Sequence, residues 1–137
     1  MAEINDKITI LIVDDEIVSR YTMEALLEDE NHTLLFAESG QQGLEKAETM
    51  TPDVMLLDVM MPGMNGFEVC RRLRAHPNPQ LASLPVIMVT AWDEQTARLR
   101  CLEIGANDVI CKPFNRDDLH NKVHHLTKNR GGETGNS

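Results

Sequence analysis

Five short apolar runs, each followed by a stretch with helical spacing, constrain the fold of this chain more than any other feature. The runs span residues 8–13, 33–37, 53–58, 84–90 and 107–111. Near-continuous apolar runs of this length are typical of strands that are covered on both faces. Strands that alternate with amphipathic helices form right-handed βαβ units and a parallel sheet. The sequence therefore predicts a doubly wound α/β fold with five parallel strands and five helices.

The helices are placed by their apolar spacing and by the residues at their ends. They are expected at residues 17–30, from 40 onward, at 66–76, up to 104 and at 115–126. Ser39 and Asn115 are the predicted N-caps, and Gly105 is the predicted stop of the fourth helix. Pro77, in the sequence "PNP", ends the third helix because it lacks a backbone donor. The side chains expected on the buried stripes are Val18, Tyr21, Ala25, Leu44, Ala47, Ala97, Cys101, Ile104, Leu119, Val123 and Leu126.

Length and composition favour one domain in a reducing compartment. A chain of 137 residues is long enough for a single core, so residues 1–128 are assigned to one domain and 129–137 to a flexible tail or truncated linker. Cys70, Cys101 and Cys111 show no CxxC spacing and are predicted to be buried free thiols. No apolar run reaches the ~18 residues of a membrane span, and the N-terminus lacks a signal peptide. These features predict a cytoplasmic protein that does not interact with membranes.

The net charge of −9 argues against nonspecific binding to nucleic acid, which needs a basic face. The acidic residues include Asp14, Asp15 and Glu16 after the first strand and Asp58 at the end of the third. Thr90 ends the fourth strand, and Lys112 follows the fifth. In an open parallel sheet the functional site lies beyond these carboxyl ends.

Carboxylates that converge need a cation, because otherwise they raise each other's pKa. Mg²⁺ suits oxygen ligands, and together with Lys112 it would balance the charges of Asp14, Asp15 and Asp58. Such a site suits phosphoryl transfer, in which Asp58 would be the nucleophile that forms an aspartyl phosphate. Lys112 and Thr90 would contact the phosphoryl oxygens.

Four motifs give the chain a family resemblance over residues 8–127. "LIVDDE", "MLLDVMMPGMNGFEV", "PVIMVTA" and "GANDVICKPF" resemble, in order and spacing, the receiver domain of two-component response regulators, including chemotaxis regulators. The resemblance implies a flavodoxin-like strand order of 2-1-3-4-5 and phosphorylation of Asp58. It also implies that Asp15, Asp58 and the Met60 carbonyl bind Mg²⁺ directly, that Asp14 binds it through water, and that the Lys112–Pro113 bond is cis.

The same resemblance implies the partners. The phosphodonor would be a phosphohistidine on a sensor histidine kinase or phosphotransfer protein, and the output would be a downstream domain or partner protein. The face made by the fourth and fifth helices is the usual partner or homodimer surface of the family. Direct nucleic-acid binding by this domain is not expected.

Three residues depart from the family pattern. Val109 stands where many receivers have Tyr or Phe, so we hypothesise that phosphorylation is read through displacement of the Thr90–Asp93 loop. Met60 and Trp92 flank the path of the hydrolytic water, and as bulky apolar side chains they are predicted to prolong the life of the phosphoryl group. Trp92 could equally be an exposed partner contact.

Other interpretations of the same residues remain open. Asp14–Glu16 could be an acidic turn that caps the first helix. His120, His124 and His125 include an i, i+4 pair that could bind a transition metal, but no further ligand is evident, which favours an exposed helix face.

Two rival functions share the fold or the chemistry. A phosphohydrolase of the haloacid-dehalogenase type needs an aspartate as general acid where this chain has Met60. A flavin-binding module needs a phosphate-binding loop where the sequence "DDEIVSR" would repel a phosphate. The prediction is therefore a phosphoacceptor switch that does not turn over external substrates.

Overall fold

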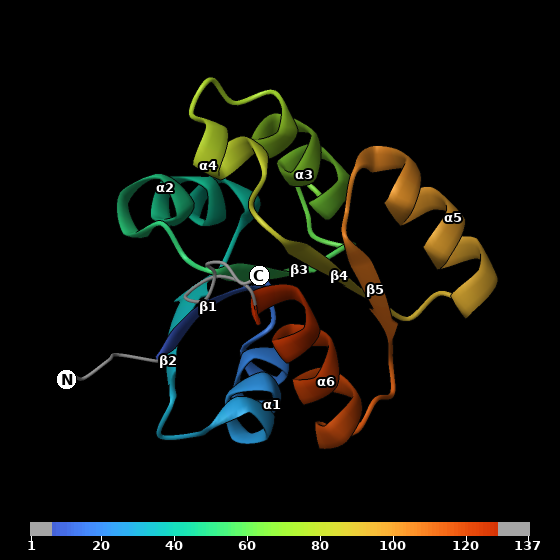
Figure 1. The fold of residues 1–137 in the computed structure, drawn as a ribbon. Helices are drawn as coiled ribbons and strands as arrows, with labels where there is room; N and C mark the ends of the chain where they lie inside the picture. Colours follow the sequence, from blue (N-terminus) through green and yellow to red (C-terminus); the bar gives the residue numbers. More distant parts are fainter. Residues whose placement is uncertain (1–6, 129–137) are drawn as a thin grey trace, which may run out of the picture.

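The computed structural model describes residues 7–128 and shows a five-stranded parallel sheet between two layers of helices (Figure 1). The strands are β1 (Ile8–Val13), β2 (His32–Ala37), β3 (Val54–Asp58), β4 (Val86–Thr90) and β5 (Asp108–Cys111). The helices are α1 (Ile17–Leu27), α2 (Gly40–Met50), α3 (Gly66–Arg74), α4 (Pro79–Ala82), α5 (Glu94–Ile104) and α6 (Arg116–Thr127). The strand order is β2-β1-β3-β4-β5, which confirms the predicted topology.

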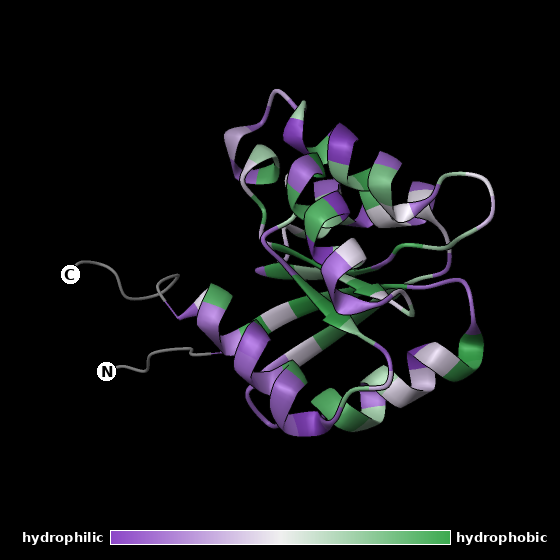
Figure 2. Cartoon of the chain, turned by 90° about the vertical axis from the view of Figure 1, so that its right-hand side faces the viewer, coloured by the Kyte–Doolittle hydropathy of each residue, from purple (hydrophilic) through white to green (hydrophobic). Residues whose placement is uncertain are grey.

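Each face of the sheet has its own apolar core. On β1, Ile10 and Ile12 point to the core beneath α1 and α6, whereas Leu11 and Val13 point to the core beneath α2, α3 and α5. This alternation follows from the two-residue period of a strand. Figure 2 shows the hydrophobic strands between helices whose outer sides are largely hydrophilic. Because both faces are covered, the polar ends of the strands are the places where a site can open to solvent.

The buried stripe predicted for the first helix is wrong. Val18 and Tyr21 are 72% and 62% exposed and Ala25 is also exposed, whereas Met23 and Leu27 are buried. The helix carries two apolar stripes, and the one with Met23 and Leu27 faces the core shared with α6. The helix also ends at Leu27 rather than at residue 30. The other stripe is left on the surface.

The expected number of helices is one too low, because a short helix, α4, begins at the second proline of "PNP". Its N-cap Asn78 accepts a hydrogen bond from the Gln80 backbone N–H at 2.9 Å, and Pro79 occupies its first turn, where a missing donor costs nothing. The predicted caps Ser39 and Asn115 are confirmed by hydrogen bonds from the third residue beyond each. Gly105 ends α5 with a φ of 107°, a conformation that favours glycine.

The remaining burial predictions hold in part. Cys70 and Cys101 are buried free thiols, but Cys111, on the edge strand β5, is only half-buried. Ile104 and Leu126 are also half-buried, and Thr127 takes the last buried position on α6. Residues 129–137, predicted as a tail, lie outside the described residues. Within residues 7–128, the helices are all too short or too polar to span a membrane.

Candidate functional site

The carboxyl ends of β1, β3 and β4 bring three polar side chains to one edge of the sheet. Asp14 directly follows β1, and Asp58 and Thr90 are the last residues of β3 and β4. In the parallel register, Val13 pairs with Leu57 and Asp58 pairs with Val89. The three polar residues are only 1%, 8% and 1% exposed, respectively. Buried polar groups of this kind need partners, so their surroundings indicate what the site binds.

Three carboxylates meet at this edge. One carboxylate oxygen from each of Asp14, Asp15 and Asp58 lies within 4.8 Å of the other two. Oδ1 of Asp14 accepts a hydrogen bond from the Glu16 N–H at 3.0 Å, whereas Oδ2 is buried and has no hydrogen-bond partner among residues 7–128. A hard cation would satisfy that oxygen and offset the repulsion between the carboxylates. The acidic cluster therefore fits Mg²⁺.

The alternative of a helix-capping turn explains less. Glu16 is the N-cap residue of α1, and its side chain makes no capping hydrogen bond. Asp14 binds the N–H two residues ahead, which shapes the turn but uses only one of its oxygens. Capping therefore leaves the second oxygen unexplained.

The pKa of Asp58 reflects the crowded charges. Burial raises this pKa to about 6, and the carboxylates of Asp14 and Asp15 push it in the same direction. The Lys112 ammonium and a hydrogen bond from the Met60 backbone N–H lower it. Without a cation, Asp58 is thus ionised only at the expense of folding free energy.

Thr90 ends β4, the strand next to β3, and Lys112 follows β5, the strand next to β4; the Lys112 ammonium acts on Asp58 electrostatically. The Lys112 backbone N–H donates to the Thr90 carbonyl oxygen at 2.7 Å. The Trp92 N–H donates to Thr90 Oγ1 at 3.1 Å, so the hydroxyl keeps its own proton for donation. The Lys112–Pro113 peptide bond is cis, as the family resemblance implies.

Gly66 allows the loop after Asp58 to pack against the end of β3. Its N–H donates to the Val59 carbonyl oxygen at 3.0 Å, and a Cβ at this position would lie 2.5 Å from the Asp58 carbonyl oxygen. No side chain fits that space.

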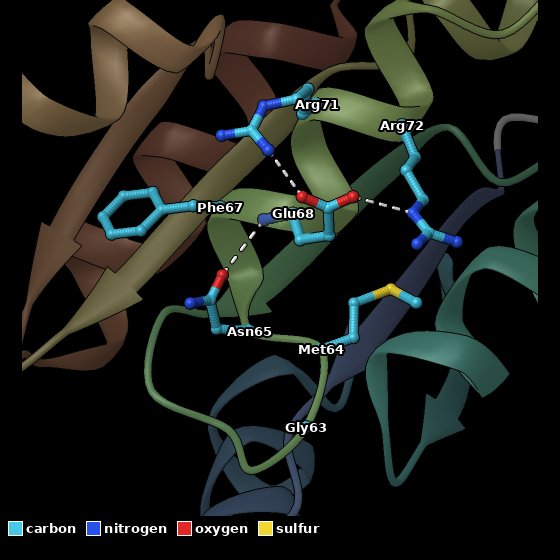
Figure 3. A pocket seen from close by; sticks show the side chains of 7 residues that line it. All are labelled: Gly63, Met64, Asn65, Phe67, Glu68, Arg71 and Arg72. Atoms are coloured by element: carbon cyan, nitrogen blue, oxygen red, sulfur yellow. Dashed lines mark hydrogen bonds and ion pairs between the residues drawn. The ribbon is translucent and has the colours of Figure 1, made fainter.

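A separate hollow of about 590 Å³ lies at the start of α3. There Asn65 caps α3 by accepting a hydrogen bond from the Glu68 backbone N–H, and the Glu68 carboxylate forms ion pairs with Arg71 and Arg72 (Figure 3). The two ion pairs measure 2.6 and 2.9 Å. The charged side chains that line this hollow are therefore largely paired with one another. The hollow contains none of the predicted site residues.

The three departures from the family pattern have different surroundings. Met60 is exposed, whereas Trp92 is half-buried and packs on Phe67 with ring centroids 5.7 Å apart. Val109 is buried in the core beneath α5. Trp92 is therefore supported by a neighbouring ring rather than extended into solvent.

The histidines of α6 were predicted to lie on an exposed face, and this holds for two of the three. His124 and His125 are exposed, but His120 is half-buried, and His32 at the start of β2 completes a cluster with His120 and His124. The expectation that no further ligand accompanies them is wrong. His32 and His124 are 92 residues apart, so no local spacing could reveal the contact.

Residues 10–124 match the family model of the response regulator receiver domain. The chain belongs to this family. The receiver domain is 39% identical to the protein PilH of Pseudomonas aeruginosa over 80% of this chain and 89% of PilH. It is also 39% identical to PhoP, the alkaline phosphatase synthesis transcriptional regulatory protein of Bacillus subtilis, over 83% of this chain and 46% of PhoP.

Solved structures agree with this assignment. The receiver domain of the sensor histidine kinase PA1611 from Pseudomonas aeruginosa, which has a magnesium ion in its active site cleft, is similar to this receiver domain with a TM-score of 0.80 and 30% identity. That match covers 89% of this chain and 98% of the other. The chain spans only about a quarter to a half of the length of most curated relatives that it matches.

Proposed function

We propose that this receiver domain accepts a phosphoryl group on Asp58 from a phosphohistidine of a sensor histidine kinase or phosphotransfer protein. The observation that carries the proposal is the acidic cluster, in which Asp58 is a buried carboxylate at a strand end, close to two other acids and within the electrostatic influence of Lys112. A structural aspartate would gain nothing from the two other carboxylates, because they disfavour its charged form.

The residues present fit Mg²⁺. Carboxylate oxygens of Asp15 and Asp58 and the Met60 carbonyl oxygen would hold it directly, and Asp14, with its unpartnered Oδ2, would hold it through water. When bound, Mg²⁺ would keep Asp58 ionised and neutralise oxygens of the incoming phosphoryl group.

The side chains of the domain then have defined tasks. An Asp58 carboxylate oxygen attacks phosphorus, and the new O–P bond forms as the P–N bond of the phosphohistidine breaks, its electron pair returning to the imidazole nitrogen. The Lys112 ammonium and the Thr90 hydroxyl proton bind phosphoryl oxygens. Turnover of external phosphate esters is not part of the proposal, because Met60 provides no proton where a phosphohydrolase has its general acid.

Intact-mass measurement tests this function. After incubation with Mg²⁺ and acetyl phosphate, we expect one labile adduct of about 80 Da, the mass of a phosphoryl group. Asp58→Asn should abolish it, whereas Glu16→Gln, a neighbouring exposed acid without a capping bond, should keep it. An adduct of equal yield in Asp58→Asn would refute the assignment.

We further infer that the phosphodonor protein docks on the exposed stripe of α1. Ile17, Val18 and Tyr21 form an apolar surface immediately after the acidic cluster. Beside it lies a hollow of about 360 Å³ whose lining includes Val18 and Lys112, so it joins this surface to the phosphorylation site. A partner held there would present its phosphohistidine to Asp58.

A comparison of two phosphodonors distinguishes docking of the partner protein from the phosphoryl transfer itself. Val18→Asp should slow transfer from a partner kinase but leave phosphorylation by acetyl phosphate unchanged, because the small donor needs no docking surface. Leu99→Asp, which changes an exposed apolar residue on α5, should leave both rates unchanged. Equal slowing with both donors would contradict the docking role. The output surface and homodimer expected on the fourth and fifth predicted helices, here α5 and α6, stay predictions.

A further inference from the structure

A cluster of three histidines lies away from the acidic cluster, where the start of β2 meets α6. His32 is buried, and His120 and His124 lie one turn apart on α6. A ring nitrogen from each lies within 4.8 Å of the other two, and the ring centroids are 5.4 to 5.7 Å apart. Three imidazoles this close need an explanation beyond packing.

Two of the rings are held in a fixed orientation by the end of α1. His32 Nδ1 is 2.6 Å from the Leu27 carbonyl oxygen, and His120 Nε2 is 2.8 Å from the Leu26 carbonyl oxygen. A carbonyl oxygen only accepts, so each of these nitrogens carries a proton. In the neutral rings the lone pairs therefore reside on His32 Nε2 and His120 Nδ1. Metal-binding histidines show the same pattern, in which one nitrogen donates to a backbone carbonyl and the other binds the metal.

The spacing of the nitrogens also fits a metal. His32 Nε2 and His124 Nε2 are 3.3 Å apart. Two nitrogens that bind one tetrahedral Zn²⁺ at about 2.0–2.1 Å are separated by about 3.3–3.4 Å. Imidazole nitrogens suit Zn²⁺ and similar transition metals, whereas Mg²⁺ prefers oxygen ligands.

The cluster can be reached from the surface. His124 is exposed, and together with His32, Asp29 and Lys128 it lines a hollow of about 310 Å³, so water or another ligand can approach the cluster.

We propose that His32, His120 and His124 form a binding site for a divalent transition metal, with Zn²⁺ as the ion that fits best. The three rings would fill three tetrahedral positions and leave the fourth open to the hollow. The bound metal would connect β2 to α6, the last helix of the described chain. This site shares no residue with the acidic cluster and does not depend on phosphorylation. The alternative is that the rings only cap the carbonyl end of α1.

Zinc titration of the full chain distinguishes a metal site from rings that only cap α1. In the presence of millimolar Mg²⁺ and against a chromophoric chelator, we expect one Zn²⁺ per chain, with affinity reduced at least tenfold in His124→Gln. The α1 carbonyl oxygens are contacted by His32 and His120, both of which this variant keeps, so it should fold normally, and its metal-free circular dichroism checks this. His125→Gln, an exposed histidine outside the cluster, is the matched control and should bind like the wild type.

Further measurements identify the ligands. Co²⁺ in place of Zn²⁺ should give the visible absorption of a tetrahedral site, and this band should persist in Asp58→Asn. Zinc should also raise the melting temperature of the wild type but not of His124→Gln, because a ligand that binds only the folded state stabilises it. Absence of zinc binding, equal affinity in His124→Gln, or loss of the zinc in Asp58→Asn would overturn the proposal.

Discussion

Replacing Asp58 with Asn should stabilise the metal-free protein, even though it removes the proposed phosphoacceptor. The folded protein raises the pKa of Asp58 from the ordinary value of 3.8 to about 6, chiefly by burial. A carboxyl whose folded pKa is raised lowers stability once it is ionised, because the unfolded chain releases the proton more readily. This rise of about 2 in pKa lowers the free energy of unfolding by about 3 kcal/mol above pH 6. The amide of Asn is neutral and avoids this cost.

The size of the gain should depend on pH in a defined way. In EDTA at about pH 7.5, Asp58→Asn should be about 2–3 kcal/mol more stable in urea unfolding, or melt roughly 6–10 °C higher. The gain should fall to about 1 kcal/mol near pH 4.5, where the wild-type carboxyl is protonated in the folded protein. Excess Mg²⁺ should stabilise the wild type more than the variant and narrow the difference.

The matched control is Glu16→Gln, which removes an exposed charge next to the cluster and should change stability by less than about 0.5 kcal/mol. If Asp58→Asn brought no gain in stability at about pH 7.5, or a gain of the same size at both pH values, burial and the neighbouring carboxylates would not raise the pKa of Asp58.

Trp92→Ala should speed the loss of the phosphoryl group several-fold in a mass-spectrometric time course, because its indole, packed on Phe67, is predicted to shield the water path; an unchanged or slower loss would refute shielding. Gly66→Ala should lower stability in urea by about 1–3 kcal/mol, since its Cβ would lie 2.5 Å from the Asp58 carbonyl oxygen; wild-type stability would show that the loop yields freely. A phosphomimetic form should shift the amide signals of residues 90–93 in NMR spectra, and identical spectra throughout residues 90–115 would exclude displacement of this loop.

The sheet and the acidic cluster were predictable because they follow from rules that act along the chain. Each strand is a buried apolar run, and in a parallel sheet all strands end at the same edge. Asp14, Asp58 and Thr90 therefore had to approach one another once the strands were assigned. The buried Oδ2 of Asp14, by contrast, depends on the turn to Glu16 and could not be read from the spacing.

Other features depend on contacts between distant segments. Helix α1 carries two apolar stripes, and only the position of α6 decides that Met23 and Leu27 are buried while Val18 and Tyr21 are exposed. The histidine cluster has the same origin, because His32 reaches α6 through the packing of β2 beside α1. Spacing along one helix shows i, i+4 pairs but not a third ligand from elsewhere.

The most direct test of the phosphoacceptor assignment is to locate the acyl phosphate in the chain. Borohydride reduces an aspartyl phosphate to homoserine, so the protein would be phosphorylated with acetyl phosphate and Mg²⁺, reduced, digested and sequenced by mass spectrometry. Homoserine should be found at position 58, and only when Mg²⁺ is present. Homoserine at Asp14, Asp15 or any other position, or the same yield at position 58 in EDTA, would contradict the proposed site.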